Sequence, residues 1–501
     1  MVPDSAVELS LNALVEHLDD HLFEQATRDW RVFSGVTPDA PPVPELPELT
    51  RPDTFQYVSE LIDSPRTDEG KRARLVLLRR EVARRFLRFR AGEPRRVVDE
   101  LLRKDAFLSA AKHWTPAEAL LELPRLASRE LRDALERDLS AHLWEQRDLF
   151  TRRDDALVAA AAELRFEPPA LVELLHGRPL TPRQVQATAL LRDTEDAFRD
   201  LLGYALRRLD TQLVPGQARV HDVRRASGAP WLCELFRRED LFHAVTRCLG
   251  DLGLHPSAEG RITVDQEAKE GRAAGAHLFE LRVPEQLRLL LQPDLGYPVY
   301  ASWLSGWGMA LSRAHVGRSL PFVERRLGDH AVVQAQGRLF ASFLLEEAWL
   351  KRYLRLTSPQ AREAARLFAF FQLVELRRDA ALTLVHKEHL ARGAFPVDDA
   401  VPRLADALGA DVSRGRTLVE GDLLGDAALS LDGWALEGRL AESLRERFNE
   451  DFFRNPAAGR WLVEAWGKGQ RDDAAQVAAA LGDEALDVLR AGRRRVTVMG
   501  A

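Results

Sequence analysis

The chain has 501 residues, of which 46% are hydrophobic and 30% are charged. This is the composition of an ordinary globular protein, and it excludes disordered and fibrous classes. The length suits about two to four domains or lobes. The formal net charge of -6 gives no overall attraction to nucleic acid or to an anionic membrane, so we expect neither as a partner.

The N-terminal residues do not resemble an export signal. Glutamates and aspartates stand where the apolar stretch of a signal peptide would lie. No uninterrupted run of about 18 apolar residues occurs, so we expect no membrane span. The two cysteines, Cys233 and Cys248, are too few for a disulfide scaffold and lack the doublet spacing of a zinc ribbon. We therefore expect a cytoplasmic protein whose cysteines are buried and reduced.

Apolar residues recur at helical spacing along most of the chain, which predicts a mainly α protein. The first helix is expected over about 6–34, and a proline-rich connector follows at 35–53, where prolines remove backbone donors. Helical patterns then continue from about 54 to 225. We assign residues 1–225 to an N-terminal helical lobe and residues 226–501 to a C-terminal lobe.

A strongly basic run, KRARLVLLRREVARRFLRFR, occupies residues 71–90. An amphipathic helix of this kind is compatible with binding to nucleic acid or to an acidic lipid surface. The overall acidity of the chain favours a different interpretation. We expect an exposed helix whose arginines pair with acidic neighbours in the same lobe.

The pattern changes at about 260–294. Here short apolar segments are bounded by Gly, Pro and Asp, which predicts a small β-sheet rather than long helices. Long helical patterns resume at 302–316, 325–350 and 359–391. Short helices complete the chain.

The helices after the predicted sheet contain SWLSGWGMALSRAHV (302–316) and RRLGDHAVVQAQGRLFASFLLEEAWL (325–350). They resemble a helix pair of the thimet oligopeptidase-like (M3) metallopeptidases. In that family a strand pair precedes a helix with H-E-x-G-H-A, and a second helix about 25 residues later supplies a glutamate. Two histidines one helical turn apart bind zinc, and the intervening glutamate is the general base. Gly308, Ala310 and Leu311 match the family's small and apolar residues.

The resemblance covers residues 226–493 and is not confined to one motif. It includes the segment before the predicted strands, the strands themselves and the C-terminal segment WALEGRLAESLRERFNEDFFRNPAAGRWLVEAWGKGQ. It implies a zincin-like clamshell, in which two helical lobes flank a cleft and one small sheet lies beside the helix pair.

In an alignment without gaps, the catalytic positions of the family hold other residues in this chain. Ser305 and Met309 occupy the two histidine positions, Gly306 the general-base position and Gln334 the position of the third ligand. Serine, methionine and glutamine are poor zinc ligands, and glycine cannot accept a proton. The resemblance therefore implies a degenerate HExxH motif, no zinc or other cofactor, and a pseudo-peptidase.

Two further helices of the family carry tyrosines near the substrate. Asp379 and Ser430 stand at those positions here. The resemblance makes five residues candidates for facing the cleft: Trp307, Asp379, His386, Ser430 and Asp432. We expect a binding or regulatory scaffold whose ligand is a peptide, held along an edge strand, or a protein partner such as an active relative.

The alternative is an active hydrolase or metallopeptidase with a rebuilt or misregistered site. Glu346, Glu347, Asp379 and His386 would supply its groups. Asp379 and His386 are seven residues apart on one predicted helix and so share a face, which would let His386 act as a base.

Two histidine pairs also have helical spacing suited to a metal. These are His17 with His21, and His386 with His389 beside Glu388. Neither pair lies in the strand-helix context of the resemblance. For both pairs we expect surface histidines without metal.

Overall fold

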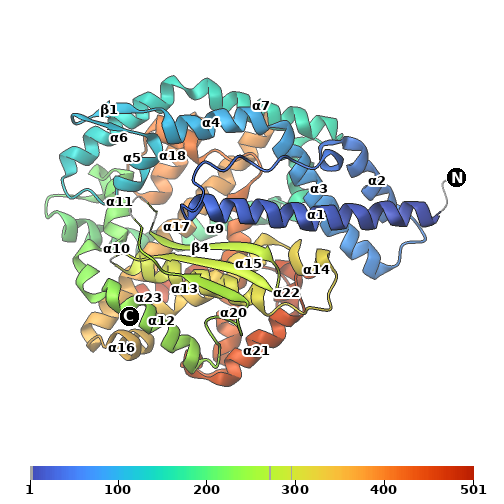
Figure 1. The fold of residues 1–501 in the computed structure, drawn as a ribbon. Helices are drawn as coiled ribbons and strands as arrows, with labels where there is room; N and C mark the ends of the chain where they lie inside the picture. The colour runs from blue at the N-terminus through green and yellow to red at the C-terminus, as the bar shows by residue number, and fades with distance from the viewer. Residues whose placement is uncertain (1–3, 270–271, 273, 295, 501) are drawn as a thin grey trace. The chain divides into compact units, whose positions relative to one another are not determined.

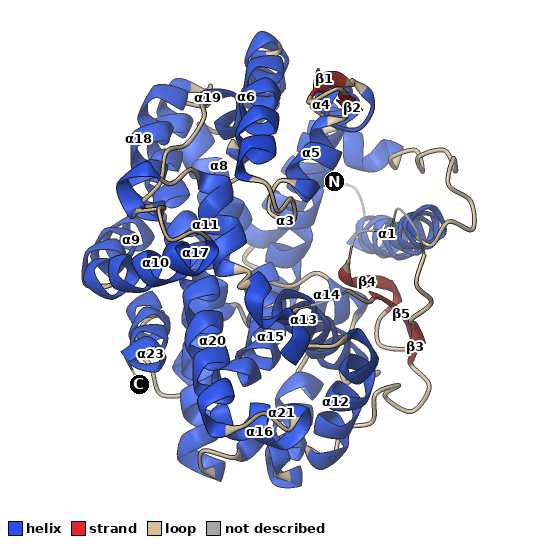
Figure 2. Ribbon diagram, turned by 90° about the vertical axis from the view of Figure 1, so that its left-hand side faces the viewer, coloured by secondary structure: helices blue, strands red, loops and turns tan. Residues whose placement is uncertain are grey.

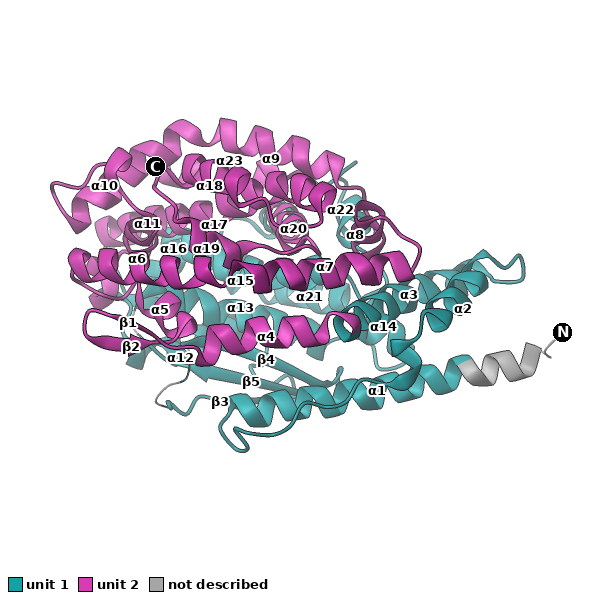
Figure 3. Cartoon of the chain, turned by 90° about the horizontal axis from the view of Figure 1, so that it is seen from above, with its two compact units in different colours: residues 1–89, 235–356, 439–486 teal, residues 90–234, 357–438, 487–501 magenta. Residues whose placement is uncertain are grey.

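The computed structural model describes residues 4–269, 272, 274–294 and 296–500. It is mainly α-helical, as predicted, with two small sheets (Figures 1 and 2). The chain divides into two compact units, each built from three separate segments (Figure 3). These units do not coincide with contiguous lobes at 1–225 and 226–501. Helical periodicity predicts helices but does not tell which distant helices are neighbours.

Unit 1 comprises Met1–Phe89, Leu235–Leu356 and Arg439–Leu486. Its helices and strands are α1 (Asp4–Phe33), η1 (Pro47–Thr50), α2 (Pro52–Asp63), α3 (Glu69–Arg90), α12 (Arg238–Asp251), β3 (Ile262–Asp265), β4 (Gly275–Arg282), β5 (Gln286–Gln292), α13 (Tyr297–Ala314), α14 (Phe322–Arg326), α15 (His330–Ala341), η4 (Ser342–Leu345), α16 (Glu347–Leu354), η6 (Phe452–Arg454), α21 (Pro456–Gly467) and α22 (Ala474–Ala480).

The three strands of unit 1 lie within the segment predicted at about 260–294. Their order is β3-β5-β4, with β3 parallel and β4 antiparallel to β5. Alternate side chains of β4 point to opposite faces. His277 and Phe279 contact the ring of Phe33 in α1, whereas Ala276 lies against Gly306 in α13. The sheet is therefore covered by α1 on one face and by α13 on the other.

The predicted helix at 325–350 is wrong as a single element. The segment forms α14, α15, η4 and the start of α16. Asp329 Oδ1 accepts a hydrogen bond from the Ala331 N–H at 2.9 Å and starts α15 as an N-cap. Glu346 has extended backbone between η4 and α16. The periodicity of apolar residues continues through these interruptions, so it does not reveal them.

Unit 2 comprises Arg90–Glu234, Thr357–Gly438 and Asp487–Ala501. Its helices and strands are α4 (Gly92–Lys104), β1 (Phe107–Ser109), β2 (Lys112–Trp114), α5 (Pro116–Glu122), α6 (Arg129–Glu145), α7 (Arg147–Glu163), α8 (Pro168–His176), α9 (Thr181–Asp193), α10 (Glu195–Leu209), η2 (Pro215–Gln217), α11 (Val220–Ser227), η3 (Pro230–Leu235), α17 (Ser358–Arg392), α18 (Val397–Leu408), α19 (Arg414–Thr417), η5 (Leu418–Glu420), α20 (Asp426–Phe448), which ends in unit 1, and α23 (Val488–Gly500).

The long helix α17 organises unit 2. It contacts α9, α18 and α23, and buried residues occur all around it, as expected for a helix enclosed by other helices. Its bounds agree with the helix predicted at 359–391. Because α17 carries both Asp379 and His386, it fixes where these two side chains lie. In the described part of the chain, no helix is long and apolar enough to cross a membrane.

The β1–β2 hairpin of unit 2 was not predicted. It pairs Phe107 with Trp114 and turns at Ala110 and Ala111, whose φ angles are 47° and 61°. Positive φ at two successive turn residues is normally signalled by Asn-Gly or Gly-Gly. Two alanines give no such signal, so the hairpin is invisible in the sequence pattern.

Candidate functional site

The two helices of the predicted degenerate motif, α13 and α15, pack directly against each other. Each presents a glycine where the other helix approaches. A Cβ atom at Gly308 would lie 2.5 Å from the backbone oxygen of Gln336, and one at Gly337 would lie 2.5 Å from Ser305 Oγ. Both distances are far shorter than van der Waals contact. The close approach of the helices therefore depends on glycine at these two positions.

Ser305 and Met309 lie on the side of α13 that faces α15. Both side chains are half-buried, and both approach Gly337 of α15. Gln334, one turn before Gly337, lies on the same side of α15. It is also half-buried, and its Oε1 atom has no hydrogen-bond partner among the described residues. The structure thus places the three aligned ligand positions along one seam.

The aligned general-base position, Gly306, is closed by the sheet. A Cβ atom here would lie 2.4 Å from the Cβ of Ala276 and 3.2 Å from Leu289 Cδ1. Ala276 is held in place, because its N–H donates to Ser302 Oγ at 2.9 Å. Any side chain at position 306 would therefore have to displace β4. The sequence shows that no glutamate is present, and the structure adds that there is no space for one.

The side chains at these positions do not fit a zinc ion. A hydroxyl, a thioether and a carboxamide are all neutral, whereas protein zinc sites are built from imidazole, thiolate and carboxylate groups. Among the residues whose side chains the structure describes, no group of three or more His, Cys, Asp or Glu is arranged to hold a metal ion. Ser305, Gly306, Met309 and Gln334 supply neither the ligands nor the base of a hydrolytic zinc site.

Trp307 belongs to the core of unit 1, and the expectation that it faces a cleft is wrong. Its side chain is fully buried. The indole Nε1 donates to the carbonyl oxygen of Pro256 at 3.2 Å, and the ring packs against Trp303 and Phe242. The helical pattern of α13 cannot separate this buried tryptophan from a ligand-facing one, because α13 is buried on most of its circumference.

Asp379 and Ser430, at the aligned tyrosine positions, bind each other in unit 2. Ser430 Oγ donates to Asp379 Oδ2, which also accepts from Trp434 Nε1 at 3.3 Å. Arg378 Nη1 donates to the other carboxylate oxygen at 3.3 Å. Both Asp379 and Ser430 are buried. This carboxylate is therefore occupied by donors from its own unit.

Asp432 holds two arginines in the same unit. Arg178 Nη2 donates to Oδ2 at 2.7 Å, and Arg183 Nε donates to Oδ1 at 3.1 Å. Asp432 is only 4% exposed. Charge-assisted hydrogen bonds of this kind are strong. The role that the contacts support is to join the α8–α9 segment to α20.

His386 is buried in contact with the chain that precedes α20. Its Nε2 lies 2.9 Å from the carbonyl oxygen of Leu423 and so donates to it, while Nδ1 has no hydrogen-bond partner among the described residues. Gly425, at φ +79°, packs on the ring so closely that a Cβ atom would lie 2.4 Å from His386 Cε1. Burial lowers the pKa of His386. The imidazole is a neutral side chain packed against backbone.

The histidine pairs are not the surface pairs that we expected. His17 is exposed, but His21 is buried and lies 3.1 Å from Glu45 Oε1. His389, like His386, is buried, and its Nε2 lies 2.8 Å from Asp154 Oδ2. Spacing on a helix shows which residues share a face but does not show whether another helix covers that face.

Glu346 and Cys248 are also engaged in unit 1. Glu346 accepts a hydrogen bond from Arg445 Nη2. Cys248 is buried, which raises the pKa of its thiol to about 12, and its sulfur accepts from Trp349 Nε1 at 3.2 Å. Cys233 is only partly buried, contrary to expectation. Neither cysteine forms a disulfide in the part of the chain that the structure describes, and Cys248 is too basic to act as a nucleophile near neutral pH.

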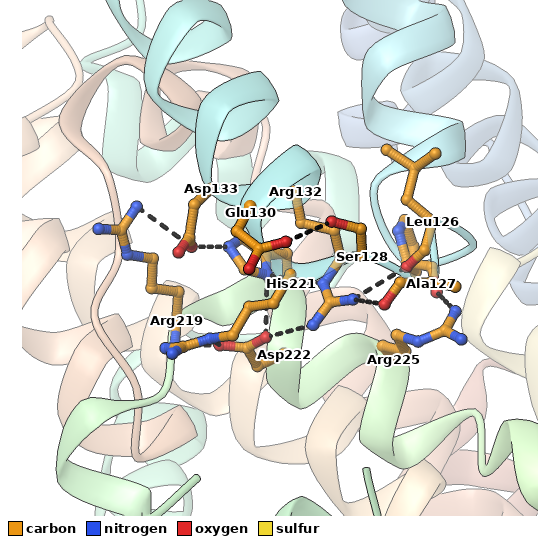
Figure 4. Close-up of polar contacts among 12 residues, drawn as sticks. Leu126, Ala127, Ser128, Glu130, Arg132, Asp133, Arg219, His221, Asp222 and Arg225 are labelled. Atoms are coloured by element: carbon orange, nitrogen blue, oxygen red, sulfur yellow. Dashed lines mark hydrogen bonds and ion pairs between the residues drawn. The ribbon is translucent and has the colours of Figure 1, made fainter. Parts of the chain in front are cut away.

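A buried polar network in unit 2 was not predicted from the sequence. His221 of α11 has Nε2 3.0 Å from Asp133 Oδ1, and its Nδ1 accepts from Arg132 Nε at 3.3 Å (Figure 4). Arg132 also donates to Asp222 Oδ1 at 2.8 Å. Burial would raise the pKa of Asp222, but its contact with His221 and its hydrogen bonds from Arg132 and the Arg219 backbone N–H hold it well below its usual range. Both imidazole nitrogens are occupied, so the network fastens α6 to α11.

No family model and no curated protein sequence matches the chain. Among solved structures, it is similar to the M32 carboxypeptidase from Deinococcus radiodurans R1, with TM-score 0.61, 12% identity and coverage of 99% of this chain and 100% of that one. It is also similar to the Pyrococcus furiosus carboxypeptidase in its apo-Mg structure (TM-score 0.59, 14% identity, 97% of each chain). A third similar structure is PZ peptidase A with an inhibitor (TM-score 0.63, 13% identity, 91% of this chain and 86% of that one). At these identities the likeness shows the fold alone: the chain has a helical, zincin-like metallopeptidase fold.

Proposed function

We propose that this protein is a pseudo-peptidase, which uses a metallopeptidase-like fold to bind a peptide or a protein segment and does not hydrolyse it through zinc. One observation carries the proposal. At the helix pair where the resembling family builds its zinc site, Ala276 of β4 occupies the space that a side chain at Gly306 would need. The neutral side chains of Ser305, Met309 and Gln334 along the same seam are consistent with it.

The edge of β4 offers one place for an extended ligand. In an antiparallel pair, every second residue points its N–H and C=O away from the partner strand. Ala276 does so, since its N–H reaches Ser302, and Glu280 does so, since its carbonyl oxygen accepts from Arg326 Nη2 at 2.6 Å. Leu278 lies between them in the strand, and the alternation of an antiparallel pair points its peptide group the same way.

Strand addition at this edge would therefore be short. One residue of an added segment can pair with Leu278, because Ser302 and Arg326 already occupy groups on either side. Pairing at a single residue orients the bound segment but contributes little to its affinity. Most of the binding energy therefore has to come from side chains of the partner. This favours a folded protein that presents an extended segment, such as an active relative of this chain, over a free peptide. The proposed setting is the cytoplasm.

The first test measures metal content and cleavage together. The full-length chain is purified without a metal-affinity tag and analysed for zinc, and a mixture of peptides is then incubated with it in the presence and absence of a chelator. We expect zinc far below one equivalent and no chelator-sensitive cleavage. Near-stoichiometric zinc together with chelator-sensitive cleavage would overturn the proposal, and the search for ligands would move to His386 and His389.

The second test concerns the strand edge. Leu278→Pro removes the backbone N–H of a half-buried edge-strand residue, and proline is tolerated at such edge positions. We expect the variant to retain its thermal stability within a few degrees and to lose at least about 1 kcal/mol, or fivefold, in binding to a captured partner segment. Unchanged affinity in a folded variant would exclude strand addition at this edge.

A further inference from the structure

The basic helix α3 forms one wall of a groove that the proposed function does not use. The groove lies in unit 1 between α1, α3 and the start of α14, which gather in the same region of the unit (Figures 1 and 3). Its volume is about 370 Å³, which lies within the usual range for small-molecule sites. A cavity of this size suits a small ligand better than a folded protein partner, whose interface would need 20–30 residues on each side (a rough norm).

Most of the groove surface is apolar. Leu11 and Val15 come from α1, Leu75 and Leu78 from α3, and Phe322 from the start of α14. Leu75 and Leu78 are buried and form the floor, whereas Leu11, Val15 and Phe322 are half-buried. An apolar chain bound here would gain about 25 cal/mol for each Å² that it removes from water.

Two cations lie at one end of this surface. Lys71 and Arg74 line the groove from the first turns of α3, before the two leucines, and none of the described residues that line it is acidic. Within the described part of the chain, the Arg74 guanidinium makes one hydrogen bond, from Nη1 to Glu324 Oε1 at 3.5 Å. That distance is at the long limit of a hydrogen bond, and it leaves the other donors of the guanidinium fork available to a carboxylate.

We propose that this groove binds a single-chain carboxylate with an apolar tail, such as a medium-chain fatty acid. The tail lies along Leu75 and Leu78, and the carboxylate is held by Arg74 with support from Lys71. The order of groups along α3, with cations first and leucines after them, gives the ligand a defined direction. The proposal also gives a role to part of the basic run at 71–90. Other arginines of that run pair within the same unit, as Arg85 does with Glu81 at 2.8 Å.

The test compares two probes that differ only in the head group. Decanoate and decan-1-ol, both below their aggregation limits, are titrated into the full-length chain by isothermal calorimetry. We expect decanoate to bind about tenfold more tightly than the alcohol, which is the contribution of a partly exposed carboxylate–guanidinium pair. Arg74→Gln should remove most of this difference and leave binding of the alcohol within about twofold.

A matched control removes a charge elsewhere on the same helix. Arg88→Gln changes an exposed residue of α3 that does not line the groove, so decanoate affinity should stay within about twofold. Val15→Trp fills the groove and should weaken both probes about tenfold or more. If that variant does not fold, Leu11→Glu is used instead, and it should weaken decanoate more than the alcohol.

Three results would overturn the proposal. The first is equal affinity for decanoate and decan-1-ol, and the second is no saturable binding of decanoate. The third is decanoate binding that persists when Val15 or Leu11 is substituted in a folded protein. Selective binding of an acidic helical peptide, without decanoate binding, would likewise reject a fatty acid and assign the groove to a protein partner.

Discussion

Two regions of this protein contain the residues that the sequence singles out, and they differ in how those residues are used. In unit 1, the seam between α13 and α15 contains small or neutral groups in very close packing, with Gly306 against Ala276. In unit 2, the region around α17 and α20 keeps charged groups, and each has a partner, as Asp432 has in Arg178 and Arg183. The two regions therefore differ in kind: the candidate positions of unit 1 lack titratable groups, whereas those of unit 2 have them and hold them in hydrogen bonds within the unit.

The largest loss of stability is expected from a substitution at Asp432 in unit 2. Asp432→Asn removes a buried carboxylate that faces the buried Arg183 and the partly buried Arg178, and such a loss costs about 3–5 kcal/mol. We expect a decrease of that size in the free energy of unfolding, measured by urea titration with far-UV circular dichroism. Asp398→Asn is the control, because Asp398 pairs with Arg414 while 81% exposed, and it should cost less than about 1 kcal/mol. Equal losses in the two variants would mean that the Asp432 cluster is not a structural centre of unit 2.

The packing of unit 1 is tested by Gly306→Ala. The added methyl group would meet the Cβ of Ala276 at 2.4 Å, and overpacking of this kind costs about 1–3 kcal/mol. The better helix propensity of alanine offsets up to about 1 kcal/mol of this cost. Gly250→Ala makes the same substitution in α12, where nothing lies within 4 Å of the new atom, so thermal unfolding should show it to be neutral or stabilising. A stable Gly306→Ala protein would show that β4 can move and that position 306 is open.

The buried imidazole of unit 2 predicts a dependence of stability on pH. Because burial lowers the pKa of His386 in the folded state, the unfolded chain binds more protons, and stability rises with pH. This contribution is present above the unfolded pKa of about 6.5 and is lost as the pH falls through and below that value. His386→Gln keeps a donor for the Leu423 carbonyl and does not titrate. Its unfolding free energy should depend less steeply on pH between about 5 and 7, by at most about 1.4 kcal/mol per unit. Identical slopes would show that His386 is not a buried neutral group.

The smallest effect is expected at Gln334. Its Oε1 atom is buried without a hydrogen-bond partner among the described residues, so Gln334→Met removes a desolvation cost and should be neutral or stabilising by up to about 1 kcal/mol. The matched change in unit 2 is Gln372→Met, where the lost Oε1 accepts from the buried Arg495 Nε at 3.1 Å. There the loss should be about 1–3 kcal/mol. If Gln334→Met is destabilising, the Gln334 amide makes a stabilising interaction, and the seam between α13 and α15 becomes the first place to look for a bound ligand.

The sequence predicts the elements better than their assembly. The long helices α1 and α17 and the strands of unit 1 follow from periodicity and from turn residues. The hairpin at Ala110 and Ala111 and the breaks around Asp329 and Glu346 do not, because alanine in a left-handed turn and a single capping residue change the hydrophobic pattern too little. These features are fixed by tertiary contacts.

For the candidate site, too, the sequence predicts which residues are present better than it predicts what surrounds them. Alignment assigns Ser305, Met309 and Gln334 to the ligand positions, and in the structure Ser305 and Met309 face Gly337 of α15. It could not show that Trp307 is enclosed by the core or that His386 and His389 are buried. One helix face looks the same in a sequence whether water, a ligand or another helix covers it. The partners of a face become visible only when segments far apart in the chain are placed together.

The contact between Gly306 and Ala276 also determines the order in which substitutions can be accepted. A side chain at position 306 meets the Ala276 methyl group, so it is harmful while that methyl is present. If Ala276→Gly occurs first, the nearest atom of residue 276 to a new Cβ is its Cα at 3.8 Å, an ordinary contact. The two changes are therefore epistatic, and their effects on stability should not add. A larger residue at position 306 is therefore accepted more easily after the Ala276 methyl group has been lost, and Leu289 Cδ1, at 3.2 Å from the new Cβ, then has to shift only slightly.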